Sequence, residues 1–258
     1  MKIIVLVKEV PDTYGDRKLN LETGLADRAA SDAVLDEIGE RSIEVALSFA
    51  DKNPDAEVVV LSMSPESAAG SIRKGLAMGA GSAVQVVDER LAGADLGLTA
   101  KVLAAAIERT GFDLVIAGNQ STDGSAGVVP AMVAELLGVP QLTGLAAVEI
   151  TESGVSGSRA TDDGVAQVSA SLPAVVSITE ALPDARFPNF KGIMAAKKKP
   201  YETLSLDDLD VTVDEAGVPH EIMTAVSEKP PRGAGVKITD EGDAGVQLAE
   251  FLISNRLA

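Results

Sequence analysis

The chain has 258 residues, a formal net charge of −17, an apolar fraction of 46% and an aromatic fraction of only 3%. This composition allows one large domain with an aliphatic core, or such a domain with an appendage, and its acidity disfavours nucleic acid and anionic membranes as partners. The chain contains no cysteine, which excludes disulfides and thiolate chemistry.

Four aliphatic runs predict strands in the first half of the chain: Lys2–Val7, Ala56–Met63, Ser82–Asp88 and Phe112–Gly118. Strands that are apolar throughout are buried on both faces, as in parallel sheets. The first run is too short for the apolar region of a signal peptide, and no small-residue cleavage site follows it. Since no window of about 18 residues is apolar throughout, we expect a cytoplasmic protein without membrane insertion.

Helical patterns separate these strands. Residues 43–50 and 96–111 repeat apolar side chains at the spacing of one helix face. Between them, Ser64 is the expected N-cap of a helix and Pro65 its first residue. The glycines in GAGSAV (residues 79–84) precede a strand, so we interpret them as the end of that helix. The alternation predicts right-handed βαβ units and an α/β fold with a doubly wound, mostly parallel sheet.

The stretch GNQSTDGSAGVVP (residues 118–130) lies between the fourth strand and a further amphipathic helix. In doubly wound sheets, ligands bind at the carboxyl ends of strands. Small residues at a helix N-terminus let an anion approach the free amides there. The stretch is therefore either a phosphate cradle or an ordinary loop in which Asp123 or Ser125 caps the helix. No Walker lysine follows it, so P-loop hydrolysis is not indicated.

The pattern changes after Gly138. Short β-prone runs separated by Ser-Gly and Asp-Gly turns predict one or two hairpins at the sheet edge, and then a last strand near 174–179. Beyond Leu182 the periodicity is lost, apart from one final helix within 241–255. We therefore divide the chain into a nucleotide-binding domain, residues 1–183, and an extended arm, residues 184–258. The only histidine, His220, lies in this arm in a polar stretch and is expected at the surface.

RFPNFKGIMAAKKKP (residues 186–200) combines apolar and basic side chains in an otherwise acidic chain. It is either a solvated basic edge strand or a docking surface in which an apolar anchor is ringed by positive charge.

Six segments in this order resemble the beta subunit of electron-transfer flavoprotein. They are VKEVPD (7–12), IRKGLAMGAG (72–81), LVIAGNQSTDG (114–124), LPAVVSITE (172–180), GIMAAKKKP (192–200) and GVKI (235–238). The resemblance covers nearly the whole chain, and the Ile-Met…Ala-Lys-Lys-Lys run is its most specific part. It implies an adenine-nucleotide-binding α/β fold, in agreement with the strand pattern.

The resemblance also implies an electron carrier subunit instead of an enzyme, with no catalytic residues and no metal. Such a subunit pairs with an alpha subunit, which the arm of residues 184–258 is expected to wrap, and a non-covalent FAD lies mainly on alpha. Electrons pass from dehydrogenases, such as the acyl-CoA dehydrogenases of fatty acid oxidation, to a membrane quinone oxidoreductase. The beta subunit binds an AMP, whereas electron-bifurcating relatives hold a second FAD there and have an NADH site. A different class stays open, a stand-alone nucleotide-binding protein of the universal-stress type, which lacks the long arm.

Carried over residue by residue, the nucleotide site maps onto Leu6, Asp36 to Gly39, Met63 and Asp123 to Ala134. In the cradle, the expected contacts are Asp123, Gly124, Ser125, Ala126, Gly127, Val128, Val129 and Ala134. AMP-binding members often carry Asn, Gln and Thr where this chain has residues 127–129. Bifurcating members often carry Thr and Gln at positions 126 and 128. Phosphate binding here is therefore expected to rest on backbone amides and Ser125, and both AMP and FAD remain candidates.

Two further positions follow from the resemblance. Thr13, in the loop after the first strand, aligns with a family position close to the isoalloxazine, where a hydroxyl is able to tune the flavin. The family's recognition loop docks on dehydrogenases through a hydrophobic residue, which maps onto Phe190, with Phe187 as the fallback. We expect the docking surface to comprise Arg186, Phe187, Phe190, Lys191, Ile193 and Met194, with Arg186 and Lys191 steering an acidic partner.

Overall fold

The computed structural model describes residues 1–15, 17–211 and 223–257. It divides into two compact units, Met1–Thr224 and Ala225–Ala258, which are described separately. His220, predicted at the surface, lies outside the described residues. Among the helices of the described ranges, none combines the length and the hydrophobicity needed to cross a bilayer.

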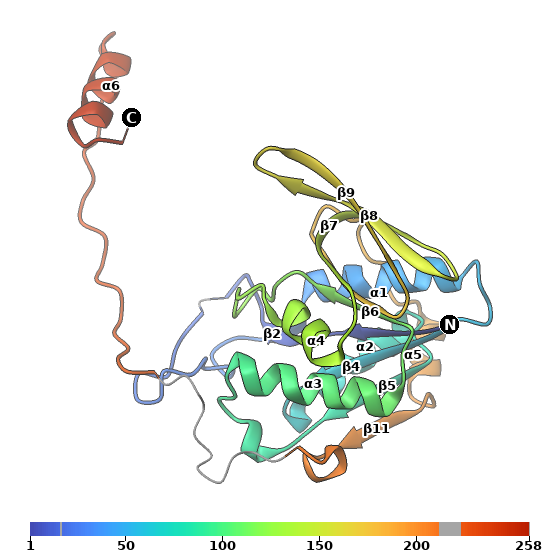
Figure 1. Cartoon of the computed structure of the whole chain (residues 1–258). Coiled ribbons are helices and arrows are strands. Elements are labelled where there is room, and N and C mark those ends of the chain that lie inside the picture. The colour runs from blue at the N-terminus through green and yellow to red at the C-terminus, as the bar shows by residue number, and fades with distance from the viewer. Residues whose placement is uncertain (16, 212–222, 258) are drawn as a thin grey trace. The chain divides into compact units, whose positions relative to one another are not determined.

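The first unit is built on a nine-stranded sheet with the order β11-β5-β4-β1-β6-β10-β7-β8-β9 (Figure 1). The strands from β11 to β7 pair in parallel. Their bounds are β1 Lys2–Leu6, β4 Glu57–Met63, β5 Ser82–Val86, β6 Leu114–Gly118, β10 Ala174–Ile178, β7 Gln141–Ile150 and β11 Tyr201–Leu204. The four predicted strands of the first half are confirmed, as is the doubly wound α/β fold.

Helices cover both faces of this sheet, which explains why its strands are apolar throughout. Side chains of β1 alternate between two core clusters: Ile3 and Val5 pack on one face, and Ile4 packs on the other. The first cluster includes residues of α1 (Glu37–Ala50), α2 (Ala69–Met78) and α5 (Phe190–Ala196). The second includes residues of α3 (Leu96–Thr110) and α4 (Val129–Leu137).

The start of α2 differs from the prediction. Pro65 is extended, and a 3₁₀ turn, η1 Glu66–Ala68, comes before the α-helix. Ser64 does not cap the helix, because its hydroxyl oxygen accepts hydrogen bonds from Ser62 Oγ and Gln85 Nε2. Gln85 also donates to the Pro65 carbonyl. The buried side chain of Gln85 in β5 therefore fixes this turn. The sequence around Ser64 does not indicate this contact, because Gln85 lies about 20 residues further along the chain.

The predicted edge hairpins are present. β7, β8 (Gly154–Thr161) and β9 (Gly164–Ser171) form an antiparallel meander that ends the sheet on one side. The last predicted strand is β10, which lies inside the sheet between β6 and β7.

Residues 184–211 are part of the first unit. The sequence instead predicted a division of the chain between residues 183 and 184. β11 adds to the sheet beside β5, and Leu204, Leu206 and Leu209, the last in η3 (Asp207–Leu209), lie in the second core cluster. The boundary between the two compact units lies at Thr224/Ala225 instead. A strand of four residues with a single buried side chain is too short to stand out by periodicity.

The second unit contains the predicted final helix, α6 Ala244–Ser254. None of its residues is buried, and its apolar side chains include Val246, Leu248, Phe251 and Ile253. A largely apolar helix with no buried residue lacks the packing that normally stabilises a helix in water.

Candidate functional site

The candidate site is the cradle, the loop of residues 119–128 between β6 and α4. It follows Gly118, the last residue of β6, where a Cβ atom would come within 2.8 Å of Ile38 Cγ2. A bare backbone at the end of β6 therefore lets the first turn of α1 lie directly on the strand. The cradle lies at the carboxyl ends of parallel strands, where doubly wound folds bind ligands.

Some of the cradle's amides are paired within the protein, and others are not. The amide of Thr122 donates to the Asp36 carboxylate, and the amide of Ser125 donates to the Ser121 carbonyl. The amide of Gly124 donates to the side chains of Ser121 and Asp123. The amides of residues 126–129 donate to no protein acceptor within the described chain. Ser125 and Gly127 adopt left-handed backbone conformations, with φ of 53° and 70°. Turns of this kind and a helix N-terminus both direct free amides outward, which suits an anion.

Asp36 ties this cradle to α1. Its carboxylate is buried, and Oδ1 accepts from the amide of Ile38, so Asp36 is the N-cap of the helix. Oδ2 accepts from the amide and the hydroxyl of Thr122, at 2.8 and 3.1 Å. Asp36 thus positions the loop through Thr122, and both of its oxygens are engaged by the protein.

Asp123 carries the ion pairs of the cradle. Oδ1 lies 2.8 Å from Lys8 Nζ, and Oδ2 lies 3.0 Å from Arg28 Nη2. Only 9% of this side chain is exposed. Burial alone raises the pKa of Asp123, but the hydrogen bonds from Lys8 and Ser121 and the charges of Lys8 and Arg28 outweigh it and lower the pKa to about 2. Two cations beside one carboxylate give this part of the cradle a net positive charge, which favours binding of an anion.

Asn119 is a candidate site residue that the sequence reasoning did not single out. It directly follows β6, and its Oδ1 atom is buried without a hydrogen-bond partner. Buried polar atoms are normally paired, so an orphaned one beside a ligand crevice indicates a group that a ligand satisfies. The backbone carbonyl of Asn119 also faces Gly127, at 3.8 Å from where a Cβ would stand. The signal available in the sequence was its place immediately after a buried strand.

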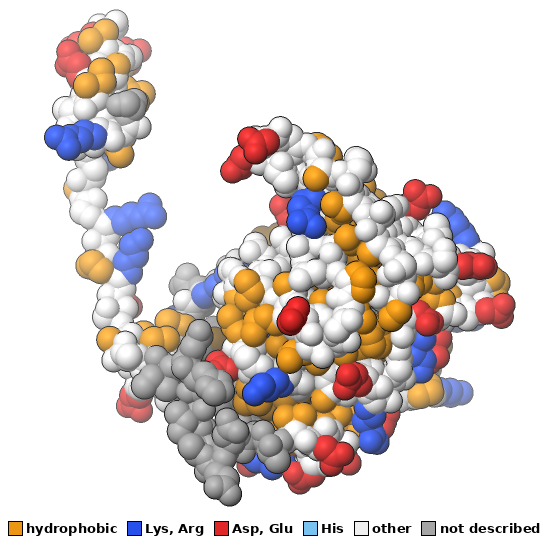
Figure 2. Space-filling view, in the orientation of Figure 1, with side chains coloured by type: hydrophobic (Ala, Val, Ile, Leu, Met, Phe, Trp, Pro, Cys, Tyr) orange, Lys and Arg blue, Asp and Glu red, His pale blue; other side chains and the backbone are white. Residues whose placement is uncertain are grey.

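The remaining predicted nucleotide contacts occupy different surroundings. Leu6 and Met63 end β1 and β4, half-buried against the second core cluster. Gly39 lies in the first turn of α1, where a Cβ would contact Val7 at 3.8 Å. Val128 is exposed, and Figure 2 shows apolar side chains at the surface in the region of α4. Ala134 is fully buried in the second core cluster and has no exposed surface to offer.

Thr13 is exposed in the segment that follows β2 (Glu9–Pro11). Its neighbour Tyr14 is more prominent, since 98% of it is exposed. The amide of Tyr14 donates to Asp12 Oδ1, which orders this turn. The phenol in this loop therefore lies one residue beyond the predicted position.

The residues of the predicted docking surface divide into Arg186, which is ion-paired within the protein, and the others, which are exposed. Arg186 forms ion pairs with Glu44 at 2.8 Å and with Asp51 at 2.8 Å, and its amide also donates to Glu44. Burial raises the pKa of Glu44, but the hydrogen bonds from Arg186 and Ser48 and the charge of Arg186 outweigh it and hold that pKa below its ordinary value. Arg186 is therefore committed to α1, which leaves Lys191 as the exposed basic residue at the start of α5.

The apolar members of this surface lie on α5 or, for Phe187, just before it. Asn189 caps the helix by accepting from the amide of Gly192, and a Cβ on Gly192 would overlap the Ala77 carbonyl of α2. Lys199 donates to the carbonyls of Leu76 and Ala80 at the end of α2. The helix is thus fixed on α2 while the large apolar side chains of the segment stay exposed: Phe187, Phe190, Ile193 and Met194.

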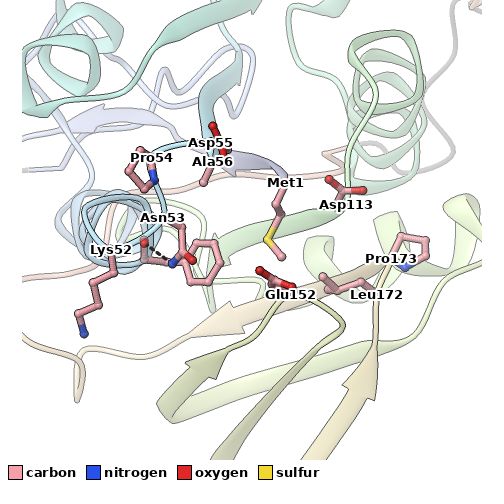
Figure 3. A pocket seen from close by; sticks show the side chains of 11 residues that line it. Met1, Lys52, Asn53, Pro54, Asp55, Ala56, Asp113, Glu152, Leu172 and Pro173 are labelled. Atoms are coloured by element: carbon pink, nitrogen blue, oxygen red, sulfur yellow. Dashed lines mark hydrogen bonds between the residues drawn. The ribbon is translucent and has the colours of Figure 1, made fainter.

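A hollow of about 460 Å³ lies at the opposite end of the sheet (Figure 3). Its lining includes Met1, Phe49 and Leu172 among the apolar side chains, and Lys52 and Glu152 among the charged ones. It lies by the amino ends of β1 and β10, away from the cradle, and no predicted site residue lines it.

Comparison with known proteins agrees with the fold. The family model for the Electron transfer flavoprotein domain matches residues 23–209. An electron transfer flavoprotein subunit beta from Mycobacterium leprae is 47% identical, over 99% of this chain and 98% of its own. One from Mycobacterium bovis is 46% identical over the same shares. The Caffeyl-CoA reductase-Etf complex subunit CarD of Acetobacterium woodii is 32% identical, over 98% of this chain and 97% of its own.

Proposed function

Because the chain belongs to the electron transfer flavoprotein family, as a beta subunit, we propose that it pairs with an alpha subunit and carries electrons through FAD in the cytoplasm. Its electron donors are dehydrogenases, such as acyl-CoA dehydrogenases, and its acceptor is a membrane quinone oxidoreductase. The chain is not an enzyme by itself, since its own residues bind and position and the flavin supplies the redox chemistry.

The observation that carries the proposal is the set of free amides at residues 126–129. They lie at the N-terminus of α4, whose dipole also favours an anion. Lys8 and Arg28 add cations at Asp123 in the same loop, and Asn119 Oδ1 is an acceptor that no protein group satisfies. Free donors, positive charge and a buried acceptor fit the phosphate and the polar edge of an adenine nucleotide, which we propose is AMP.

Binding of the phosphate by backbone amides explains why small side chains suffice in this cradle. Positions 126–129 are Ala, Gly, Val and Val. None of these side chains donates a hydrogen bond, so none competes with the amides for the phosphate. The nucleotide is then held by the shape of the loop, which Asp36 and Asp123 maintain through Thr122, Lys8 and Arg28.

The exposed face of α5 suits a second task, the docking of electron donors. Phe190 projects from the first turn of a helix that is fixed on α2, so an anchor is presented without a large loss of entropy on binding, and Phe187 is exposed in the segment just before that helix. Lys191 is exposed beside them and steers an acidic donor surface.

The test is to purify the co-expressed alpha–beta complex, release its small molecules and identify them by mass. We expect one FAD and one AMP for each heterodimer, and a colourless chain when it is purified alone. Two FAD for each heterodimer would favour the second candidate, an electron-bifurcating subunit with an NADH site. The relative named as a subunit of the Caffeyl-CoA reductase-Etf complex is the reason for considering this second candidate. A chain that is yellow by itself, or that forms a stable homodimer without flavin, would contradict both.

A further inference from the structure

The turn that follows β4 borders the proposed nucleotide site. β1 lies between β4 and β6 in the sheet, and Leu6 at its end pairs with Leu61 of β4 and with Ala117 of β6. Beyond this register β4 continues to Met63, and β6 continues to Gly118, which the cradle follows. The strand order reverses between β1 and β6, and ligands of doubly wound sheets bind at such a point. The turn after β4 therefore lies opposite the cradle, across the end of β1.

One buried side chain supports this turn. Gln85 of β5 is 1% exposed, and its Nε2 atom donates to the Ser64 hydroxyl at 3.1 Å and to the Pro65 carbonyl at 2.8 Å. Ser62 is also buried and donates to the Ser64 hydroxyl at 3.2 Å. The 3₁₀ turn η1 that follows has no side-chain cap of its own. The side-chain support of the end of β4 thus depends on a single amide group.

Tyr201 of β11 fixes the orientation of that amide. Its hydroxyl donates to Gln85 Oε1 at 2.7 Å. A carbonyl only accepts hydrogen bonds, so the amide nitrogen of Gln85 has to face Pro65, and the amide oxygen then faces Tyr201. Burial raises the pKa of Tyr201 to about 12, against the opposing effect of the Arg73 charge, so the phenol keeps the proton that it donates.

Other contacts hold the ring of Tyr201. The guanidinium carbon of Arg73 lies 4.6 Å from the ring centroid, and Arg73 Nη1 donates to the Ala196 carbonyl at the end of α5. The backbone of Tyr201 pairs with Ala83 of β5. None of these contacts uses the hydroxyl, so its removal should free the Gln85 amide and leave the ring in place.

We propose that Gln85, fixed by Tyr201, is a positioning residue for the nucleotide: it holds the turn after β4 at the separation from the cradle that the bound nucleotide requires. This inference rests on the proposed function, because it names a support of that nucleotide site. Gln85 is buried, so it acts through Ser64 and Pro65 and not by contact with the nucleotide. A buried polar network whose members are all satisfied specifies one geometry.

The experiment follows the loss of nucleotide from the co-expressed alpha–beta complex during dialysis, with the retained nucleotide identified and quantified by mass. Tyr201→Phe should speed the loss about fivefold, the effect of one hydrogen bond. Thr110→Val is the matched control, because it also removes one hydroxyl and keeps the side-chain shape. The Thr110 hydroxyl donates to the Ala106 carbonyl at the end of α3, by the amino end of β6. This control should leave the rate unchanged.

A second variant tests whether Tyr201 acts through Gln85. Gln85→Met keeps a side chain of similar length without its hydrogen bonds, and it should speed the loss at least as much as Tyr201→Phe. The double variant should lose nucleotide no faster than Gln85→Met alone, because both changes break the same network. If Gln85→Met does not fold, Tyr201→Phe and its control decide the question.

Three results would overturn the inference and leave the proposed function intact. They are a lowered urea midpoint of Tyr201→Phe with an unaltered rate of loss, an equal acceleration in Thr110→Val, and additive effects in the double variant. A parent complex that carries no nucleotide beyond the FAD of the alpha subunit would overturn the proposed nucleotide site as well.

Discussion

Replacing Phe190 by alanine separates docking from folding, because 80% of this residue is exposed. A phenylalanine buries roughly 200 Å² when it is covered completely. The exposed share therefore leaves about 40 Å² buried in the free protein, worth about 1 kcal/mol of stability at 25 cal/mol per Å². Covering the other ~160 Å² on docking gives an upper limit of about 4 kcal/mol, and truncated anchors typically cost about 2 kcal/mol or more.

Phe190→Ala should therefore slow flavin reduction by a cognate dehydrogenase roughly thirtyfold at limiting concentrations. FAD content and nucleotide content should not change, and the thermal midpoint should fall by only a few degrees. Stopped-flow reduction of the alpha–beta complex measures the rate, with Val165→Ala as the control for an exposed apolar truncation elsewhere. Unfolding of the variant, or an unaltered reduction rate, would refute the assignment and make Phe190 a packing residue.

Three other substitutions test the cradle and the support of α5. Gly127→Asp should weaken nucleotide retention by a few kcal/mol on dialysis, since it places a charge beside the free amides; Gly138→Asp carries the same left-handed backbone strain, at φ 65°, and should retain the nucleotide. Asp123→Asn should lower the unfolding free energy at pH 7 by about 1–2 kcal/mol, because the depressed pKa stabilises the folded state above about pH 4 and the effect is lost as pH falls toward 2. Urea unfolding at pH 7 and pH 3 measures this, and an equal loss at both values would contradict it. Lys199→Met should cost about 1–3 kcal/mol in the same assay by leaving the carbonyls of Leu76 and Ala80 unpaired, whereas Lys198→Met, at an exposed position, should be neutral.

The parallel sheet was predictable because its signal is local. Strands such as β1 and β6 are apolar throughout, since helices cover both of their faces. The hairpins after Gly138 were predictable for the same reason, because their turns carry Gly and Asp. β11 was not, because a strand of four residues with one buried side chain carries too little pattern. Its place in the sheet depends on the edge of β5 that does not pair with β4, and β5 lies more than 100 residues earlier in the chain.

The place of the cradle followed from the sequence, but the internal support of the cradle did not. Small residues after a buried strand locate the loop at the carboxyl end of the sheet. The pairing of Asp123 with Lys8 and Arg28, and of Asp36 with Thr122, joins segments about 86 to 115 residues apart, as their separations show. Arg186 illustrates the same limit: its charge suggested a role in steering, whereas the fold commits it to Glu44 and Asp51.

The sequence by itself therefore determined the fold class, the order of the main elements, the position of the cradle and the family. These depend on periodicity, turn residues and ordered motifs, which neighbouring residues encode. Only the tertiary structure decided which charged side chains form ion pairs within the protein and which side chains stay exposed, such as Tyr14 and Phe190. The physical reason is that the residue type alone gives the charge of a side chain. Its ion-pair partner and its burial depend on segments that meet only when the chain folds.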